Sequence, residues 1–384
     1  MNRRHNASVL LTFAVCALSV LFTALFLCLM PLNRAWVARR DFIVYWATGQ
    51  QLARHGNPYD AAALGQIETN AGFQGGASYY MRNTPWALPL ALPLGYTTAM
   101  ASALPWSLAM LGLLVISVRA LWKALGPPGN HLDWLGYCFP PALFCVILGQ
   151  TSILLLFGLA GFLCLYKSHP FVAGAALWFC SIKPHLFLPF ALVLLAWVVF
   201  TRSYRILAGA AAAFAAGAAL TTWISPSAWS QYLFYIRTSV ITREFTPCIG
   251  DLLRDTICPS AEWLAFLPAA LACIWALAYF WPRRHNWDWL EHGGLLILVS
   301  LTVAPFGWIF DHAVAIPAIL VAAARNSSPG KLSLLALLYF LIEIQIVSPW
   351  GLHSLAYIWP APAWLLWYWY TRRTAPHAPI AASA

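Results

Sequence analysis

Charged residues are scarce in this chain of 384 residues. Asp and Glu together number 12, and all charged residues make up 9% of the sequence. The chain also lacks a Walker A motif and a Gly-x-Gly-x-x-Gly turn after a strand, so the two common soluble nucleotide-binding patterns are absent. Apolar residues are abundant instead, because 61% of the chain is hydrophobic. We therefore expect an all-α polytopic membrane protein, for which lipid is the main solvent.

Metal-binding patterns are missing as well. Seven of the nine cysteines lie in apolar segments, where they pack as small hydrophobic side chains. Cys248 and Cys258 fall in a predicted outer loop, and no His stands at metal-ligand spacing from them. We predict no metal and no other cofactor. An oxidising periplasm would permit a disulfide between these two cysteines, and the sequence leaves that pairing open.

The basic residues predict the orientation of the chain. They flank short turns, as at Arg202 with Arg205 and at Arg283 with Arg284, and the positive-inside rule places such turns in the cytoplasm. The net charge of +10 therefore needs no nucleic-acid partner. The first apolar segment, residues 8–30, is too long for a signal peptide, so we expect a retained anchor with a cytoplasmic N-terminus.

We expect a single transmembrane domain over residues 1–373, without an appended soluble module. Two outer loops are predicted at residues 31–83 and 225–260, and a disordered cytoplasmic tail at residues 374–384. Apolar segments of roughly 20 residues predict about 10 to 13 crossings. Residues 84–122 are long enough for two crossings, which leaves the topology between Pro85 and Gln150 open. The Ala-rich and Gly-rich stretch near residues 208–220 predicts close helix packing.

The first outer loop carries an acidic residue beside the membrane, in the stretch RRDFIVYWATGQQLARHGNPYD. A helix beginning at Asp41 would place Asp41 and Tyr45 on one face and an apolar surface suited to the membrane interface on the other. Gly56 and Pro58 break the pattern, and Asp60 can cap a second helix. The sequence thus predicts a helix-turn-helix loop outside the bilayer. Asp41 is either a catalytic group or only the cap of its own helix.

A few polar residues stand out within apolar segments. Lys183 in SIKPH lies between two apolar runs, and inserting a Lys at the centre of a membrane helix costs about 2.5 to 3.5 kcal/mol of free energy. Lys183 is therefore either an anion-binding group that offsets this cost or a lysine that snorkels to the interface beside Pro184. Gln150 in LGQTS is a substrate contact or an interhelical hydrogen-bonding residue. The position of Asp311 at a predicted helix start favours an N-cap over a catalytic role for this residue. His312 is either a substrate contact or a buried polar residue.

Two further basic side chains are candidates for substrate contacts. Arg82 stands where the first outer loop returns to the membrane, and it is either such a contact or an ordinary interfacial cation. His185 shares the SIKPH motif with Lys183.

Five stretches resemble one family in the order in which they occur. The first loop, DFIVYWATGQQLARHGNPYD, resembles the first-loop signature of glycosyltransferase family 87. The later stretches are similar to the Pro-rich, Gly-Gln, Lys-Pro and Asp-His segments of that family, and together the five cover residues 40–317. The later stretches are NTPWALPLALPLG, LGQTSILLL, AGAALWFCSIKPHLFLP and FDHAVAIP.

The resemblance implies a GT-C membrane glycosyltransferase, similar to the polyprenol-phosphate-mannose-dependent mannosyltransferases of bacterial envelopes. It implies a polyprenyl-phosphate sugar donor, a glycolipid or glycan acceptor, and an active site on the outer side of the bacterial plasma membrane. By the same resemblance, Asp41 is the catalytic base. A carboxylate can accept the proton of an attacking hydroxyl, which gives inversion without a covalent intermediate.

A departing phosphate needs positive charge, for which Lys183, His312 and Arg82 are the candidates. We add four residues as expected substrate contacts: Tyr45, Gln150, His185 and Asp311.

Two other classes of protein would share this composition. A transporter or flippase for a lipid-linked sugar would place its key charges near the membrane midplane and would show repeated halves. No convincing repeat occurs, and Asp41 lies in a loop. A purely structural membrane scaffold would need neither Lys183 nor His312.

Overall fold

The structure is a computed structural model that describes residues 3–29, 33–74, 80–126, 132–238, 245–325, 328–348 and 351–373. All regular secondary structure in these residues is helical, which confirms the predicted fold class. The predicted tail, residues 374–384, lies outside the described residues.

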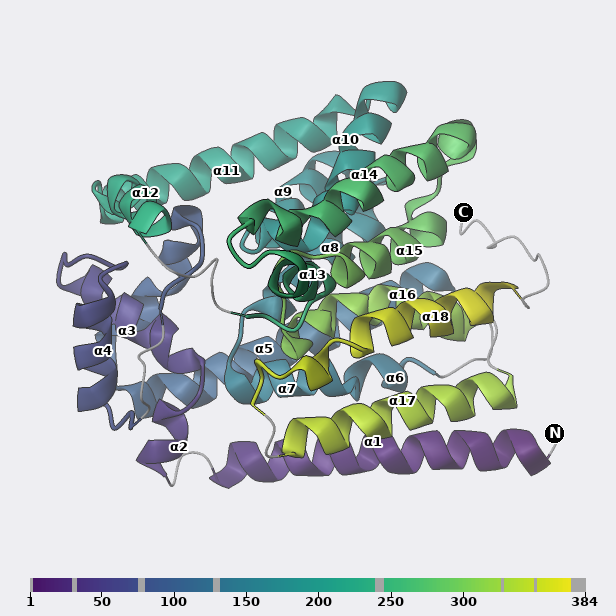
Figure 1. Ribbon diagram of the computed structural model, residues 1–384, viewed down its shortest axis with the longest axis horizontal. Helices are drawn as coiled ribbons and strands as arrows, with labels where there is room; N and C mark the ends of the chain where they lie inside the picture. Colours follow the sequence, from purple (N-terminus) through teal and green to yellow (C-terminus); the bar gives the residue numbers. More distant parts are fainter. Residues whose placement is uncertain are drawn as a thin grey trace.

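The helices alternate with short turns along the chain (Figure 1). The α-helices are α1 (Arg3–Leu29), α2 (Arg34–Ala38), α3 (Phe42–Ala53), α4 (Ala61–Asn70), α5 (Ala99–Leu125), α6 (Trp134–Tyr137), α7 (Pro140–Leu148), α8 (Ser152–Leu165), α9 (Pro170–Cys180), α10 (Leu188–Thr201), α11 (Tyr204–Ile224), α12 (Ala228–Thr238), α13 (Ile249–Ile257), α14 (Leu267–Phe280), α15 (Trp289–Thr302), α16 (Ile316–Arg325), α17 (Pro329–Val347) and α18 (Pro360–Arg373). The 3₁₀ turns are η2 (Pro85–Leu90), η3 (Leu92–Tyr96), η4 (Pro184–Phe187), η6 (Glu262–Phe266), η7 (Trp281–Asn286), η8 (Ile309–Ala315) and η9 (Leu355–Tyr357).

Six helical segments in the described part of the chain are long and apolar enough to cross a membrane. Four shorter apolar helices accompany them. The chain is therefore a multi-pass membrane protein, while the expected number of crossings stays a prediction. The six are Leu10–Leu29, Ala99–Leu125, Pro184–Thr201, Tyr204–Ile224, Glu262–Asn286 and Pro329–Val347, and the four are Trp134–Leu148, Ser152–Leu165, Pro170–Cys180 and Trp289–Thr302.

Residues 84–122 contain one membrane-length helix and not two. The prolines at the start of this stretch lack an N–H group for a regular α-helix, and the chain forms the turns η2 and η3 there. Helix α5 follows with 27 residues. The nearby α7 has only nine residues and ends at Gly149, whose φ of 72° lies in the left-handed region.

The segment predicted as the first outer loop contains the predicted pair of helices, α3 and α4. The side chain of Asp60 accepts hydrogen bonds from the backbone N–H groups of Ala62 and Ala63, at 3.0 and 3.1 Å, as expected of a cap. The prediction of a membrane-facing apolar surface on α3 was wrong, because nine of its 12 residues are buried in the protein. Its backbone touches η3, where a Cβ added to Gly49 would lie 2.2 Å from the carbonyl oxygen of Ala91.

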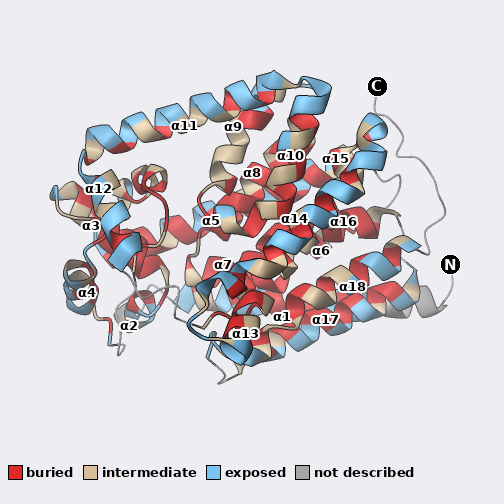
Figure 2. Cartoon of the chain, turned by 45° about the horizontal axis from the view of Figure 1, so that its top comes forward, coloured by how far each residue is buried: buried red, intermediate tan, exposed pale blue. Residues whose placement is uncertain are grey.

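The stretch of small residues in α11 packs closely, as predicted. A Cβ on Gly209 would lie 1.9 Å from the carbonyl oxygen of Phe171 in α9. Helix α11 runs along one edge of the molecule from the α10 turn to α12, while α1 and α17 lie side by side along the opposite edge (Figure 1). Exposed residues are frequent on α11, whereas α8 is mostly buried (Figure 2).

Candidate active site

Asp41 immediately precedes α3 and does not cap it. The residue occupies the N-cap position, but its side chain makes no capping hydrogen bond. Burial raises the pKa of Asp41 above the ordinary value for Asp, because little water solvates the charged form; Gln150, Lys183 and Arg82 act in the opposite direction. The interpretation of Asp41 as only a cap is therefore wrong.

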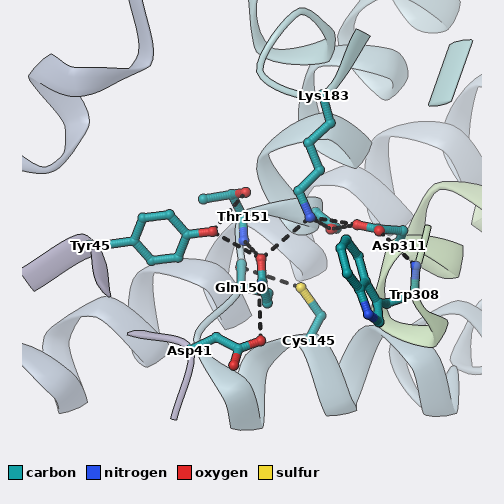
Figure 3. A network of polar contacts seen from close by, with 9 residues as sticks. Asp41, Tyr45, Cys145, Gln150, Thr151, Lys183, Trp308 and Asp311 are labelled. Carbon is teal, nitrogen blue, oxygen red and sulfur yellow. Dashed lines mark hydrogen bonds and ion pairs between the residues drawn. The ribbon is translucent and has the colours of Figure 1, made fainter. Parts of the chain in front are cut away.

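Gln150 connects Asp41 to a lysine on the other side of the site (Figure 3). Its Nε2 donates to Asp41 Oδ2 at 2.8 Å. Its Oε1 accepts from the hydroxyl of Tyr45 at 2.9 Å and lies 3.4 Å from Lys183 Nζ. Burial raises the pKa of Tyr45, so its phenol keeps the proton that it donates. One amide thus links a carboxylate, a phenol and an ammonium group.

Gly149 makes the turn that presents Gln150 to Asp41. Its left-handed backbone ends α7, and a Cβ at this position would lie 2.6 Å from the Cβ of Phe42. The indole of Trp106 donates to the carbonyl oxygen of Gly149 at 2.8 Å, and Cys145 Sγ donates to that of Gln150 at 3.3 Å. The turn is held from both sides and touches the residue that follows Asp41.

Arg40 holds the end of α7 beside the site. Its guanidinium donates to the carbonyl oxygens of Val146, at 3.0 Å, and of Ile147, and to the hydroxyl of Ser107 at 2.7 Å. Burial lowers the pKa of Arg40 to about 10, which leaves it charged at neutral pH. A cation at the C-terminus of a helix meets unsatisfied carbonyl groups and the negative end of the dipole. The residues around Arg40 show no pattern that predicts this role.

Lys183 forms a buried ion pair with Asp311. Its Nζ lies 2.7 Å from Asp311 Oδ1, and its side chain is 10% exposed. The same oxygen accepts from Ser152 Oγ at 2.6 Å, and Oδ2 accepts from the backbone N–H of Trp308 at 3.0 Å. Although burial alone would raise the pKa of Asp311, Lys183 and these donors lower it overall, so the carboxyl group stays charged. Lys183 points into the protein and does not snorkel.

Asp311 is not the N-cap of η8, although its carboxylate accepts from the backbone N–H of the N-cap residue, as in a capping box. The cap position of η8 belongs to Trp308, and Asp311 is the third residue of the turn. Sequence reasoning also missed Ser152, although it stands in the LGQTS motif two residues after Gln150.

Arg82 is close enough to Asp41 for its charge to act on that carboxylate. Its guanidinium lies over the ring of Trp308, 5.5 Å from the ring centroid, and the side chain is half-buried. Arg82 and Lys183 both lower the pKa of Asp41 through their charge. The structure therefore brings two predicted cations toward the predicted base, from segments far apart in the sequence.

The two predicted histidines are close to the ion pair, but neither forms a hydrogen bond with it in the described part of the chain. His312 is buried, and burial lowers its pKa to about 4, so its ring is neutral at pH 7. The contact between His312 and a phosphate stays a prediction, and a neutral ring could still donate one N–H group to it. His312 Nδ1 and His185 Nε2 are buried without a hydrogen-bond partner among the residues that the structure places. Both rings keep a free position for a neutral polar group.

Cys248 and Cys258 are free thiols in the structure. Cys248 Sγ donates to the carbonyl oxygen of Pro305 at 3.1 Å, and Cys258 lies 3.2 Å from the hydroxyl of Ser260. Over the described ranges, no group of three or more His, Cys, Asp or Glu side chains could hold a metal ion. Independence from metals stays a prediction.

The model of glycosyltransferase family 87 matches residues 80–305, which is more than half of the chain. The chain belongs to glycosyltransferase family 87. No match was found among curated proteins or among solved structures. The protein is thus a membrane glycosyltransferase, with a sugar donor and an acceptor as its substrates.

The family match covers only part of the candidate site. Arg82, Gln150 and Lys183 lie within the matched residues, whereas Asp41 precedes them and Asp311 follows. The first-loop signature around Asp41 therefore stays a resemblance. The hydrogen bond from Gln150 to Asp41 and the ion pair from Lys183 to Asp311 join both unmatched carboxylates to the matched region.

The turn at Gly149 gives a testable prediction for this glycosyltransferase. Gly149→Ala should lower sugar transfer by at least 10-fold, because the methyl group would push Gln150 and Phe42 apart. An alanine in the left-handed region also costs about 1 to 2 kcal/mol for its backbone alone. Gly126→Ala is the matched control, since Gly126 has a φ of 57° and nothing within 4 Å of an added Cβ.

Transfer rates and thermal inactivation in detergent distinguish the two effects. Both variants should lose a similar small amount of stability from the backbone, while only Gly149→Ala should lose activity. Equal activity in the two variants would show that the contact with Phe42 does not position the site.

Proposed function

We propose that this glycosyltransferase is a hexosyltransferase that moves mannose from a polyprenyl-phosphate donor to an envelope glycolipid or glycan. The reaction would take place at the periplasmic face of the bacterial plasma membrane, with the N-terminus in the cytoplasm and with inversion at the anomeric carbon. The observation that supports this proposal is the carboxylate of Asp41, which caps no helix and is held by the amide of Gln150.

Asp41 has the properties of a general base. No hydrogen bond to its Oδ1 is found within the described part of the chain, so this oxygen can accept a proton from an acceptor hydroxyl. As the proton moves to Asp41, the hydroxyl oxygen bonds to the anomeric carbon and the bond from that carbon to the phosphate oxygen breaks. The electron pair leaves with polyprenyl phosphate, which needs no general acid at neutral pH.

The departing phosphate gains negative charge, which Arg82 and Lys183 are placed to stabilise. Only one contact of Lys183 is short, at 2.7 Å to Asp311; those to Gln150 and Ser152 measure 3.4 Å. Its remaining N–H groups can therefore turn toward a phosphate while the ion pair persists. Gln150 and Tyr45 orient the carboxylate, and the free nitrogens of His185 and His312 suit sugar hydroxyls. No metal is required by this scheme.

A transporter or flippase for a lipid-linked sugar is the second candidate. Buried charges such as the Lys183–Asp311 pair also occur in transporters. The family match favours sugar transfer, because it identifies a glycosyltransferase.

The test is sugar transfer by the purified protein in lipid nanodiscs. Radiolabelled polyprenyl-phosphate mannose, polyprenyl-phosphate glucose and GDP-mannose are each offered with a pool of envelope glycolipids. We expect a labelled product from polyprenyl-phosphate mannose alone, and an inverted anomeric configuration by NMR. A product from GDP-mannose only would contradict the lipid-linked donor. Movement of labelled donor between leaflets of liposomes, without any product, would support the flippase.

A further inference from the structure

A basic cavity lies at the end of α11 that is remote from the first outer loop. It has a volume of about 570 Å³ and opens to the surface between three connections: the α8–α9 turn, the α10–α11 turn and η7. Four cationic side chains contribute to its lining, and no carboxylate does. They are Lys167, Arg202, Arg205 and Arg284.

Three of these cations form no ion pair within the described part of the chain, and only Lys167 is paired with a carboxylate. Lys167 pairs with Asp288 at 2.6 Å, and Arg284 donates to the carbonyl oxygen of Trp281 at 2.6 Å. Arg202 and Arg205 are exposed and form no ion pair with any residue whose position is described. Arg202 also has a φ of 56°, which ends α10 and fixes its place in the turn. The cavity therefore carries positive charge that is available to an anion.

The rim of the cavity is amphipathic. The hydroxyl groups of Thr201 and Ser203 belong to the lining, and they lie 2.8 Å apart. The flanking segments also carry exposed large apolar side chains, with Val199 of α10 61% and Trp281 of η7 62% accessible. Tyr204 lines the cavity and is also exposed, as is common for aromatic residues at a membrane interface. This arrangement suits a ligand with an anionic head and apolar chains.

The cavity is separate from the candidate active site. Helix α11 has 21 residues and is therefore about 32 Å long. The cavity lies at its Tyr204 end, whereas α12 follows its other end and contacts the first loop through Tyr232 and Tyr59, whose rings are 5.2 Å apart (Figure 1). An anion bound here cannot be the leaving phosphate of a reaction at Asp41, and the inference does not depend on the proposed function.

We propose that this cavity binds the phosphate group of an anionic phospholipid such as phosphatidylglycerol. Arg202 and Arg205 form charge-assisted hydrogen bonds with the phosphate, since arginine matches phosphate geometry well. The acyl chains lie along the exposed apolar residues of α10 and η7. Basic pockets between transmembrane helices bind anionic head groups by the same physics.

The test is native mass spectrometry of the full chain in detergent, titrated with dioleoylphosphatidylglycerol and, separately, with dioleoylphosphatidylcholine. The wild-type protein should retain phosphatidylglycerol more tightly. Arg202→Gln with Arg205→Gln should weaken its binding about 25-fold, at about 5-fold for each arginine. Arg283→Gln is the matched control, because Arg283 is exposed in the same turn as Arg284 but does not line the cavity.

Three results would overturn the proposal. Equal affinity for the two lipids would remove the requirement for an anionic head group. An equal loss in Arg283→Gln would show an effect of overall charge and not of this cavity. Inorganic phosphate is the second probe. If phosphate displaces phosphatidylglycerol at concentrations comparable to that of the lipid, and the double variant abolishes this competition, the site takes a soluble anion instead.

Discussion

Asp41→Asn should lower kcat/KM for sugar transfer by about 10²- to 10⁴-fold, the usual contribution of a general base. The asparagine has the same shape, and its amide oxygen can still accept the hydrogen bond from Gln150 Nε2. The site should therefore keep its structure while losing the group that accepts the proton. The measurement compares initial rates of radiolabelled transfer by wild type and variant in nanodiscs.

Asp60→Asn is the control for this variant. Asp60 lies in the same loop, is exposed and caps α4, a role that Asn fills equally well. It should leave transfer and stability unchanged. If a folded Asp41→Asn protein transfers sugar at the wild-type rate, Asp41 is not the base and another acceptor of the proton must be sought.

The pH dependence follows from the same carboxylate. Burial raises the pKa of Asp41, and only the deprotonated form can accept a proton. The value of kcat/KM should thus fall as the pH falls through a pKa that lies above 3.8, the ordinary value for Asp. A profile measured from pH 4 to pH 8 should show this acidic limb in wild type, and its absence would place the base elsewhere.

Breaking the buried ion pair between Lys183 and Asp311 should strongly lower the stability of the protein. Removing one partner of a buried ion pair leaves an uncompensated charge and typically costs about 3 to 5 kcal/mol. Lys183→Met and Asp311→Asn should therefore each cause early thermal inactivation and low yield. The combined variant has no unpaired charge, and its asparagine can still bond to Ser152 and Trp308, so it should regain most of the stability.

Activity of the combined variant decides the role of Lys183. If Lys183 holds the leaving phosphate, the stable double variant should remain at least 100-fold slower than wild type. Full recovery of transfer would show that the pair is only structural. Lys167→Met is the control, because Lys167 pairs with Asp288 while 68% exposed, and surface pairs contribute at most about 1 kcal/mol.

Local features of the fold were predictable from the sequence, and contacts between distant segments were not. Asp60 caps α4 through residues two and three positions away, so its role is contained in a short stretch. The burial of α3 depends on the close approach of Gly49 to η3, which no local pattern reveals. Hydropathy also cannot distinguish the proline-rich turns before α5 from a second membrane span.

The candidate site shows the same division. Asp41, Gln150, Lys183 and Asp311 were recognised one by one, because polar groups are costly in an apolar chain. The sequence does not reveal which of them pair, since Gln150 lies 109 residues from Asp41 and Lys183 lies 128 residues from Asp311. Lys183 was expected to face an anion, and the sequence does not show that a carboxylate already offsets its charge.

The distance along the chain between Lys183 and Asp311 also affects how the protein is made. A ribosome that has delivered α10 to the membrane has already inserted Lys183, but Asp311 follows 128 residues later. During this interval the nascent chain holds a lysine whose partner has not yet been synthesised. Chains that terminate before η8 keep Lys183 without Asp311, and we expect them to be less stable in the bilayer than the full chain, because a buried charge without its partner is costly.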